Sequence, residues 1–236
     1  MKKIIALTIL TLASFNSFAN DNAKRLIEMI IKKDIAVFRD GGKSNIRHVI
    51  PRVNASQLIS EYSNNQYEYE KKYNNQIINI KTVASSVKND LSGDAFVKAN
   101  GENQFEYVSL ELKNKDNAMN INKGSKLDLI CVGTKDNVMF PILKNCVTFD
   151  SYFQSFLEKT MNNINELNEE DAPKNFYEAL YLGLWELDIK NPNKLDKYDE
   201  VDEFGKSGRQ DFEKAVKIAK TKAVTEESKT ITMPKP

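Results

Sequence analysis

The spacing of apolar residues divides the chain into a helical beginning, a strand-rich middle and a helical end. After residue 20, apolar residues recur every three or four positions, which is the period of an amphipathic helix. The apolar positions of this stripe are Ala23, Leu26, Ile27, Ile30 and Ile31. We expect this helix to begin at Asp21 and to end before Gly41, because an acidic residue suits a helix start and glycine a helix end.

A second helical pattern follows around Leu58 and Tyr62, with Asn54 or Ser56 as its N-cap. The polar residues 63–65 then interrupt the pattern. Three further tyrosines lie either on another helical turn or on an extended segment that leads into the first strand. They are Tyr67, Tyr69 and Tyr73. Tyrosines set among lysines can stack on the bases of a single strand or simply brace a fold, and we favour bracing for Tyr73.

From residue 76 the apolar period changes to two, which predicts β-strands. The predicted strands cover 77–87, 94–99, 105–112, 126–132 and 142–149, with a small polar element between the third and fourth. Five strands in this order are typical of an OB fold, a partly open Greek-key barrel. The spacing by itself fits a small sandwich as well.

Alternation along the second and third predicted strands identifies a candidate binding surface. If Val108 and its neighbours of equal parity point inward, the residues between them point outward. The candidate ligand-binding residues on that outward face are Phe96, Lys98, Phe105 and Tyr107. OB folds bind nucleic acid or sugar strands on this face through aromatic stacking and a basic rim. The alternative is that a flanking helix covers these rings, since exposed apolar patches are usually covered.

After the strands the helical period returns, at 150–167, 171–189 and 209–224, with an acidic connector at 196–203. Pro173 is expected near the start of the second of these helices. The fold class is therefore α+β, a five-stranded OB-like β-barrel flanked by N-terminal helices and a C-terminal helical region. The predicted segments are 1–19 (signal peptide), 20–52 (helix and linker), 53–149 (barrel), 150–224 (helical region) and 225–236 (flexible tail).

The first residues have the pattern of a secretory signal peptide. Lys2 and Lys3 precede the short apolar run 4–12, and small residues at Ser17 and Ala19 fit a cleavage site after Ala19. The apolar run is shorter than the ~20 residues that span a bilayer, and no later run is longer, so we expect no transmembrane anchor. The prediction is a periplasmic or secreted protein; the alternative is an uncleaved N-terminal helix.

The net charge of the chain without residues 1–19 does not favour the binding of a polyanion. Removing residues 1–19 takes away two of the 34 basic residues and none of the 33 acidic ones, which leaves a net charge of −1. Affinity for nucleic acid normally comes from an excess of Lys and Arg that releases counterions. Any such binding would need a local basic patch.

The two cysteines are predicted to form a disulfide, because an isolated pair in an exported protein is usually oxidised. Cys131 and Cys146 lie on consecutive strands, and an antiparallel hairpin centred between Val138 and Met139 places them opposite each other. The alternative is two small apolar side chains in the core. With His48 as the sole histidine, the chain lacks four ligands for zinc, so no metal is expected.

The sequence contains no pattern that predicts catalysis or a cofactor. His48 lies in a loop-like segment without a flanking signature, and we interpret it as a surface or hinge residue. Glycine-rich phosphate-binding loops are absent from the sequence. We therefore expect a non-enzymatic protein without a cofactor.

Three segments resemble the bacterial tRNA_anti-like OB-fold family over residues 53–149. The matching positions are Tyr62, Asn65 and Tyr73 at the helix-to-strand entrance, Ile121 and Gly124 in a turn, and Asn145 with Cys146 in the last strand. One departure is Thr82, which stands where the family's first strand has a glycine; Gly133 follows the fourth strand instead. The resemblance implies an OB fold, and the family has no settled activity to carry over.

These patterns lead to one functional hypothesis and one alternative. The hypothesis is an exported, non-enzymatic module that binds a ligand or a protein partner in the bacterial cell envelope, with an envelope protein as the favoured partner. The alternative is a binder of single-stranded nucleic acid or oligosaccharide (a glycan) that uses the face of the second and third strands.

Overall fold

A computed structural model gives the fold. It describes residues 2–46, 49–90, 93–136, 139–191, 194–198, 206–223, 225, 231 and 233–236, with side chains described from residue 20 onward. The chain divides into two compact units, and each is described by itself. One unit contains residues 47–155 and 233–236, and the other contains residues 1–46 and 156–232. His48, which we interpreted from sequence as a surface or hinge residue, lies outside the described residues.

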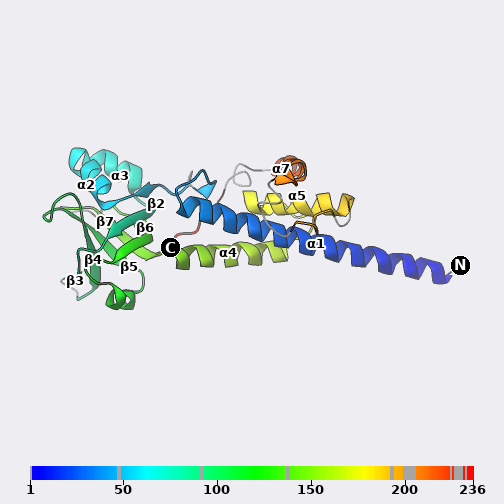
Figure 1. The fold of residues 1–236 in the computed structure, drawn as a ribbon, viewed down its shortest axis with the longest axis horizontal. Coiled ribbons are helices and arrows are strands. Elements are labelled where there is room, and N and C mark those ends of the chain that lie inside the picture. Colours follow the sequence, from blue (N-terminus) through cyan, green and yellow to red (C-terminus); the bar gives the residue numbers. More distant parts are fainter. Residues whose placement is uncertain are drawn as a thin grey trace. The chain divides into compact units, whose positions relative to one another are not determined.

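The first unit is built on a seven-stranded sheet (Figure 1). Its strands are β1 (Arg52–Val53), β2 (Ile77–Val83), β3 (Ser86–Asn89), β4 (Ala95–Asn100), β5 (Tyr107–Leu112), β6 (Lys126–Gly133) and β7 (Ile142–Thr148). Their order in the sheet is β1-β2-β6-β7-β5-β4-β3. All neighbours are antiparallel except β1 with β2 and β5 with β7, which are parallel.

The predicted α+β class is confirmed, but the five-stranded OB-like barrel is observed as an open seven-stranded sheet. The sheet is open, because its edge strands β1 and β3 do not pair with each other in the described part of the chain. The first predicted strand also breaks at Ala84 and Ser85, where the chain changes partners. The Ala84 N–H donates to the Ser125 carbonyl (2.9 Å), whereas the Ser85 N–H donates to the Lys98 carbonyl of β4 (2.8 Å). The run therefore contributes β2, which pairs with β6, and β3, which pairs with β4.

Helices α2 (Ala55–Asn64) and α3 (Gln66–Tyr73) lie next to each other and share Asn65 (Figure 1). Asn65 ends α2, and its side chain accepts a hydrogen bond from the Glu68 N–H to cap α3. At the start of α2 the cap is Asn54 rather than Ser56. The tyrosine segment is thus helical, which settles the question that its sequence left open.

Three tyrosines of these helices belong to the hydrophobic core of the sheet unit. The rings of Tyr62 and Tyr69 lie 5.3 Å apart, and those of Tyr69 and Tyr73 lie 5.0 Å apart. All three are buried, whereas Tyr67 is 73% exposed. The bracing role predicted for Tyr73 is confirmed by this burial.

Alternation along β5 is as predicted, with Val108, Leu110 and Leu112 buried in the core. The strand begins at Tyr107, two residues later than predicted, so Phe105 lies in the preceding turn. The Phe105 N–H donates to the Asn103 side chain (2.8 Å) in that turn. The small element between the third and fourth predicted strands is a 3-10 helix, η2 (Lys115–Asn120).

The second unit is helical. Its elements are α1 (Lys2–Arg39), the greater part of α4 (Phe149–Glu166), α5 (Phe176–Lys190) and α7 (Arg209–Lys222). Helix α1 starts at Lys2, so the predicted start at Asp21 is wrong; residues 13–20 contain neither glycine nor proline to break the helix. Helix α5 begins at Phe176, shortly after Pro173, and its cap is Asn175, whose side chain accepts a hydrogen bond from the Glu178 N–H.

The apolar stripes of this unit pair α1 with α5 and α5 with α7. The predicted stripe of α1 is buried at Ala23, Leu26, Ile27 and Ile31. A side chain at Gly183 of α5 would place its Cβ atom 2.3 Å from the Ala215 carbonyl oxygen of α7. Glycine is therefore required there for the two helix backbones to approach this closely.

The C-terminal end of the chain is held in place at several positions. Ile231 and Met233 are buried, and the Pro234 carbonyl accepts a hydrogen bond from the Tyr152 hydroxyl (2.6 Å). The flexible tail predicted over 225–236 is therefore restrained at its last residues. In the part of the chain that the structure describes, no helix is long and apolar enough to cross a membrane.

Candidate ligand-binding groove

A groove of about 530 Å³ lies on the outward side of the sheet unit, and we call it the β5 groove. Its floor is formed by Tyr107, Ser109 and Glu111, which alternate with the buried residues of β5. Phe96 of β4 lines one side. Ile142 and Lys144 of β7 line the other side. The groove exists because side chains of equal parity on three adjacent strands share one face of the sheet.

Of the four residues proposed from sequence, two line this groove. Phe96 and Tyr107 are in its wall and floor, and both are partly exposed. Lys98 does not line the groove, but its ammonium lies over the Tyr107 ring, 3.8 Å from the centroid. Phe105 is 76% exposed and outside the groove, because it lies in the turn before β5. The structure therefore brings Phe96, Lys98 and Tyr107 together and leaves Phe105 apart.

Tyr107 is in contact with two neighbours. Besides Lys98, it packs against Phe140, with the ring centroids 4.5 Å apart. Phe140 comes from the loop before β7, where its neighbour Met139 also lines the groove and is 73% exposed. The sequence offered no signal for Phe140 or Met139, because loop residues follow no apolar period.

Glu111 is the groove residue that the sequence could have identified. It shares the parity of Tyr107 on β5, so the alternation that selected Tyr107 also selects Glu111. Its carboxyl is half-buried and makes no hydrogen bond or ion pair within the described residues. Burial raises the pKa of this carboxyl, and the nearby Asp90 and Asp94 carboxylates add to that effect, whereas Lys144 opposes it.

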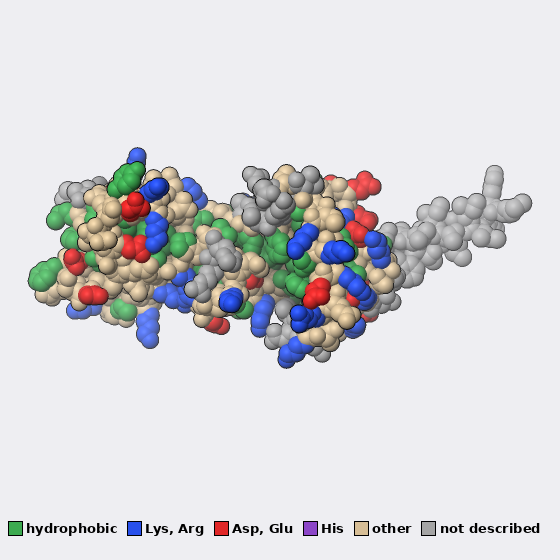
Figure 2. Space-filling model, turned by 90° about the horizontal axis from the view of Figure 1, so that it is seen from above, with side chains coloured by type: hydrophobic (Ala, Val, Ile, Leu, Met, Phe, Trp, Pro, Cys, Tyr) green, Lys and Arg blue, Asp and Glu red, His purple; other side chains and the backbone are tan. Residues whose placement is uncertain are grey.

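The lysines around the groove are mostly paired. Lys115 forms an ion pair with Asp94 at the rim. Lys144 forms an ion pair with Asp136 (3.0 Å). The hydrogen bond from Lys144 holds the pKa of the Asp136 carboxyl below its usual value. Around the rest of the unit, basic and acidic side chains are interspersed on the face that Figure 2 shows.

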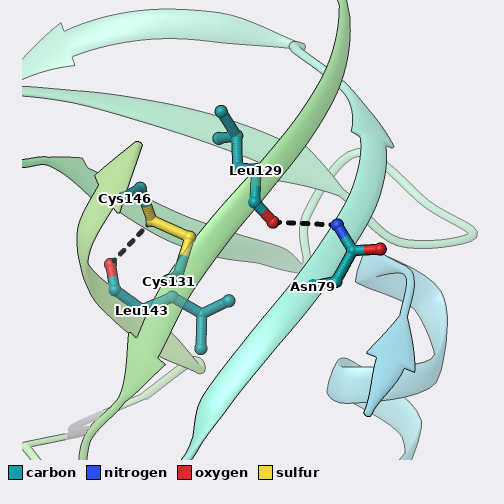
Figure 3. Close-up of a disulfide and its surroundings, with 5 residues drawn as sticks. All are labelled: Asn79, Leu129, Cys131, Leu143 and Cys146. Carbon is teal, nitrogen blue, oxygen red and sulfur yellow. Dashed lines mark hydrogen bonds between the residues drawn. A yellow bond between two sulfur atoms is a disulfide. The ribbon is translucent and has the colours of Figure 1, made fainter. Parts of the chain in front are cut away.

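A buried disulfide joins β6 and β7 (Figure 3). The predicted pairing of Cys131 with Cys146 is confirmed, and both residues belong to the core of the sheet unit. The Cys146 sulfur lies 3.7 Å from the Leu143 carbonyl oxygen. This is a contact rather than a donated hydrogen bond, because a disulfide sulfur carries no hydrogen.

The disulfide lies at a β-bulge, so the hairpin is not centred on one point as predicted. Ile130 is opposite Val147, in the predicted register, but Val132 is opposite Lys144, one residue out of that register. The extra residue is Asn145, whose φ of 53° is in the left-handed region that asparagine tolerates. Asn145 lines the groove, so the bulge places a polar side chain at its edge.

A buried asparagine fixes the neighbouring strand. The Asn79 side chain of β2 donates to the Leu129 carbonyl of β6 (3.2 Å, Figure 3) and to the Asp128 carboxylate (2.7 Å). Asn79 has the same parity on β2 as the partly exposed Ile77 and Lys81, yet it is fully buried. The Asn79 backbone N–H also donates to the Pro51 carbonyl just before β1 (2.9 Å).

No group of three or more potential metal-ligating side chains is found among the residues that the structure describes. In the β5 groove, Lys115 and Lys144 instead form ion pairs with Asp94 and Asp136, beside the aromatic rings of Tyr107 and Phe140. This arrangement can bind a ligand by packing and hydrogen bonding.

The chain matches a family model and is similar to chains of solved structures. No curated protein matches the chain. A crystal structure from Klebsiella pneumoniae, titled a "putative nucleic acid-binding lipoprotein", is similar at 12% identity, with a TM-score of 0.34 over 41% of this chain and 91% of that one. The tRNA_anti-like family model matches residues 1–147, beyond the 53–149 segment of the sequence resemblance at the N-terminal side. The chain belongs to the tRNA_anti-like family.

Proposed function

We propose that this protein is an exported, non-enzymatic binding module of the bacterial cell envelope, and that its ligand occupies the β5 groove. The observation that carries the proposal is the position of the groove. It lies on the outward face of β4 and β5, between the turn before β4 and the loop before β7. OB folds bind their ligands on this strand face, flanked by the corresponding two loops.

The strand connections support an OB-like module. Strands β2 and β3 come from one continuous run, yet they pair at different places in the sheet order, β2 with β6 and β3 with β4. The third and last of the five predicted strands, β5 and β7, pair in parallel. Family membership favours the same interpretation.

Export is proposed from the N-terminal pattern and the disulfide. Residues 1–19 have a basic start, a short apolar run and small residues before the cleavage point. The Cys131–Cys146 disulfide fits an oxidising compartment. Mass spectrometry of the protein from a periplasmic or culture-medium fraction should find Asn20 as the first residue. Recovery of the chain only in the cytoplasm, with Met1 or Lys2 retained, would count against export.

The binding site can be tested before the ligand is known. A photo-crosslinking residue at Met139, which is exposed at the groove, should give a discrete adduct in intact cells. The adduct should disappear with Tyr107→Ala and persist with Tyr67→Ala, a matched control on an exposed tyrosine of the same unit outside the groove. Absence of an adduct, or equal loss with both substitutions, would contradict the proposed site. A protein adduct would support the envelope partner, and a glycan or nucleic-acid adduct would support the alternative ligand.

A further inference from the structure

We infer that the β5 groove binds an uncharged carbohydrate chain and not a nucleic-acid strand. This inference rests on the proposed function, which makes the groove the binding site. It follows from the groove's cations, the Glu111 carboxylate on its floor and its apolar wall, which are independent features of the same surface.

The cations that a phosphate backbone would need are already engaged. Lys98 lies over the Tyr107 ring, Lys115 is paired with Asp94, and Lys144 is paired with Asp136. Lys113 is the remaining lysine in the described lining of the groove, and it is exposed. Nucleic-acid affinity depends on several lysines or arginines that displace counterions. A polyanion in this groove would therefore have to break existing contacts to gain more than one cation.

The Glu111 carboxylate disfavours a polyanion and favours a hydroxyl-rich ligand. It lies on the groove floor and lacks a hydrogen-bond donor among the described residues. An ionised carboxylate only accepts hydrogen bonds, so it repels phosphate but can accept from two sugar hydroxyls. The Ser109 hydroxyl and the Asn145 amide line the same groove and add both donors and acceptors.

The apolar wall provides the second requirement of a carbohydrate site. Phe96, Met139 and Phe140 line the groove, and Met139 is largely exposed. The C–H faces of a sugar ring are apolar and can pack on such side chains, while its hydroxyls reach polar groups at the edge. A strongly cationic ligand fits less well, because the Lys115 and Lys144 ammoniums lie along the same groove.

The test compares neutral oligosaccharides with an oligonucleotide on the purified, disulfide-bonded protein without residues 1–19. The carbohydrate probes are glucose hexasaccharides with α1→4 or β1→4 linkages and an N-acetylglucosamine hexasaccharide with β1→4 linkages. The nucleic-acid probe is a 12-nucleotide oligo-dT. Binding of each probe is measured by calorimetry at 50 and 300 mM salt. We expect at least one hexasaccharide to bind, with less than about a twofold change in Kd between the two salt concentrations, because no ions are released.

Substitutions locate the binding and separate the outcomes. Glu111→Gln should weaken hexasaccharide binding by roughly five- to tenfold, since a charge-assisted hydrogen bond becomes a neutral one. The matched control Glu102→Gln, on an exposed carboxylate outside the groove, should change Kd less than about twofold. Binding of oligo-dT without any hexasaccharide, reduced by Tyr107→Ala, would overturn the carbohydrate inference and keep the groove as the site. The inference would be overturned if hexasaccharides bound with the same Kd to the Glu111→Gln and Tyr107→Ala variants as to the parent protein. It would also be overturned if no probe bound. The crosslinking at Met139 then decides separately whether the groove is a site at all.

Discussion

The Lys98 ammonium lies 3.8 Å from the centroid of the Tyr107 ring, across the β4–β5 pair. A cation over a partly exposed aromatic face contributes about 0.5–1 kcal/mol. We predict a coupling energy of this size in a double-mutant cycle of Lys98→Met and Tyr107→Leu, measured by urea unfolding. The cycle Lys98→Met with Tyr67→Leu is the control and should give no coupling. Equal coupling energies in the two cycles would mean that the contact between Lys98 and the Tyr107 ring does not contribute to stability.

Reduction of the disulfide should cost a substantial part of the stability of the sheet unit. The bond closes a loop with a sequence separation of 15, for which chain entropy predicts about 3 kcal/mol. We expect the double substitution Cys131→Ala and Cys146→Ala to lower the free energy of unfolding by about that amount.

Labelling provides an independent check on this bond. Iodoacetamide should label Cys131 and Cys146 only in denatured protein that has first been reduced, since both side chains are buried and oxidised. Labelling of the denatured, unreduced protein would show that the bridge is absent in solution.

Gly133, the last residue of β6, lies against the backbone at the end of α3. A larger residue at this position should destabilise the sheet unit. A Cβ atom at this position would lie 2.2 Å from the Tyr73 carbonyl oxygen. The backbone there is also fixed by hydrogen bonds from the Asn75 N–H to the Gly133 carbonyl (2.9 Å) and from the Gly133 N–H to the Gln76 carbonyl (3.0 Å). Gly133→Ala is predicted to cost about 1–3 kcal/mol in thermal or urea unfolding. Lys123→Ala, at an exposed position, should remain within about 0.5 kcal/mol of the parent.

Two buried tyrosines should respond in opposite ways to loss of their hydroxyl. The Tyr177 hydroxyl donates to the Asp34 carboxylate (2.9 Å), so Tyr177→Phe should lower stability by about 1–2 kcal/mol. The Tyr69 hydroxyl is buried without a hydrogen-bond partner in the described part of the chain. Tyr69→Phe should therefore be neutral or stabilising, because it removes an unpaired polar group. Similar losses for both variants in urea unfolding would refute this contrast.

Ionisation of the Glu111 carboxyl should lower the free energy of unfolding as pH rises. Its folded pKa is raised above the ordinary value of 4.5 chiefly by burial, so the unfolded chain ionises more readily than the folded one. The penalty is absent below pH 4.5, grows as pH rises from there to the folded pKa, and is constant above it. Glu111→Gln removes this penalty, so its stability relative to the parent should increase over that window. Unfolding curves at pH 3.5, 5 and 7 measure the difference, and a difference that does not vary with pH would contradict the assignment.

The sequence by itself determined features that depend on local periodicity. Alternation predicted which side chains of β5 point into the core. It also predicted that Tyr107 points outward, because successive side chains of a strand face opposite ways. The helical stripe of Ala23 and Leu26 fixed the buried side of α1 in the same manner. The pairing of Cys131 with Cys146 also followed, since two consecutive strands with a short loop have few arrangements.

Only the tertiary structure decided the features that depend on contacts between distant residues. The partner change at Ala84 and Ser85 divides one predicted strand between β2 and β3, and it depends on which strands lie beside each half and not on spacing along the chain. The bulge at Asn145 shifts the register by one residue, which depends on the backbone conformation at that position. The groove is lined by Phe96 of β4, Tyr107 of β5 and Phe140 of the loop before β7. Spacing along the chain cannot predict that these three segments lie together.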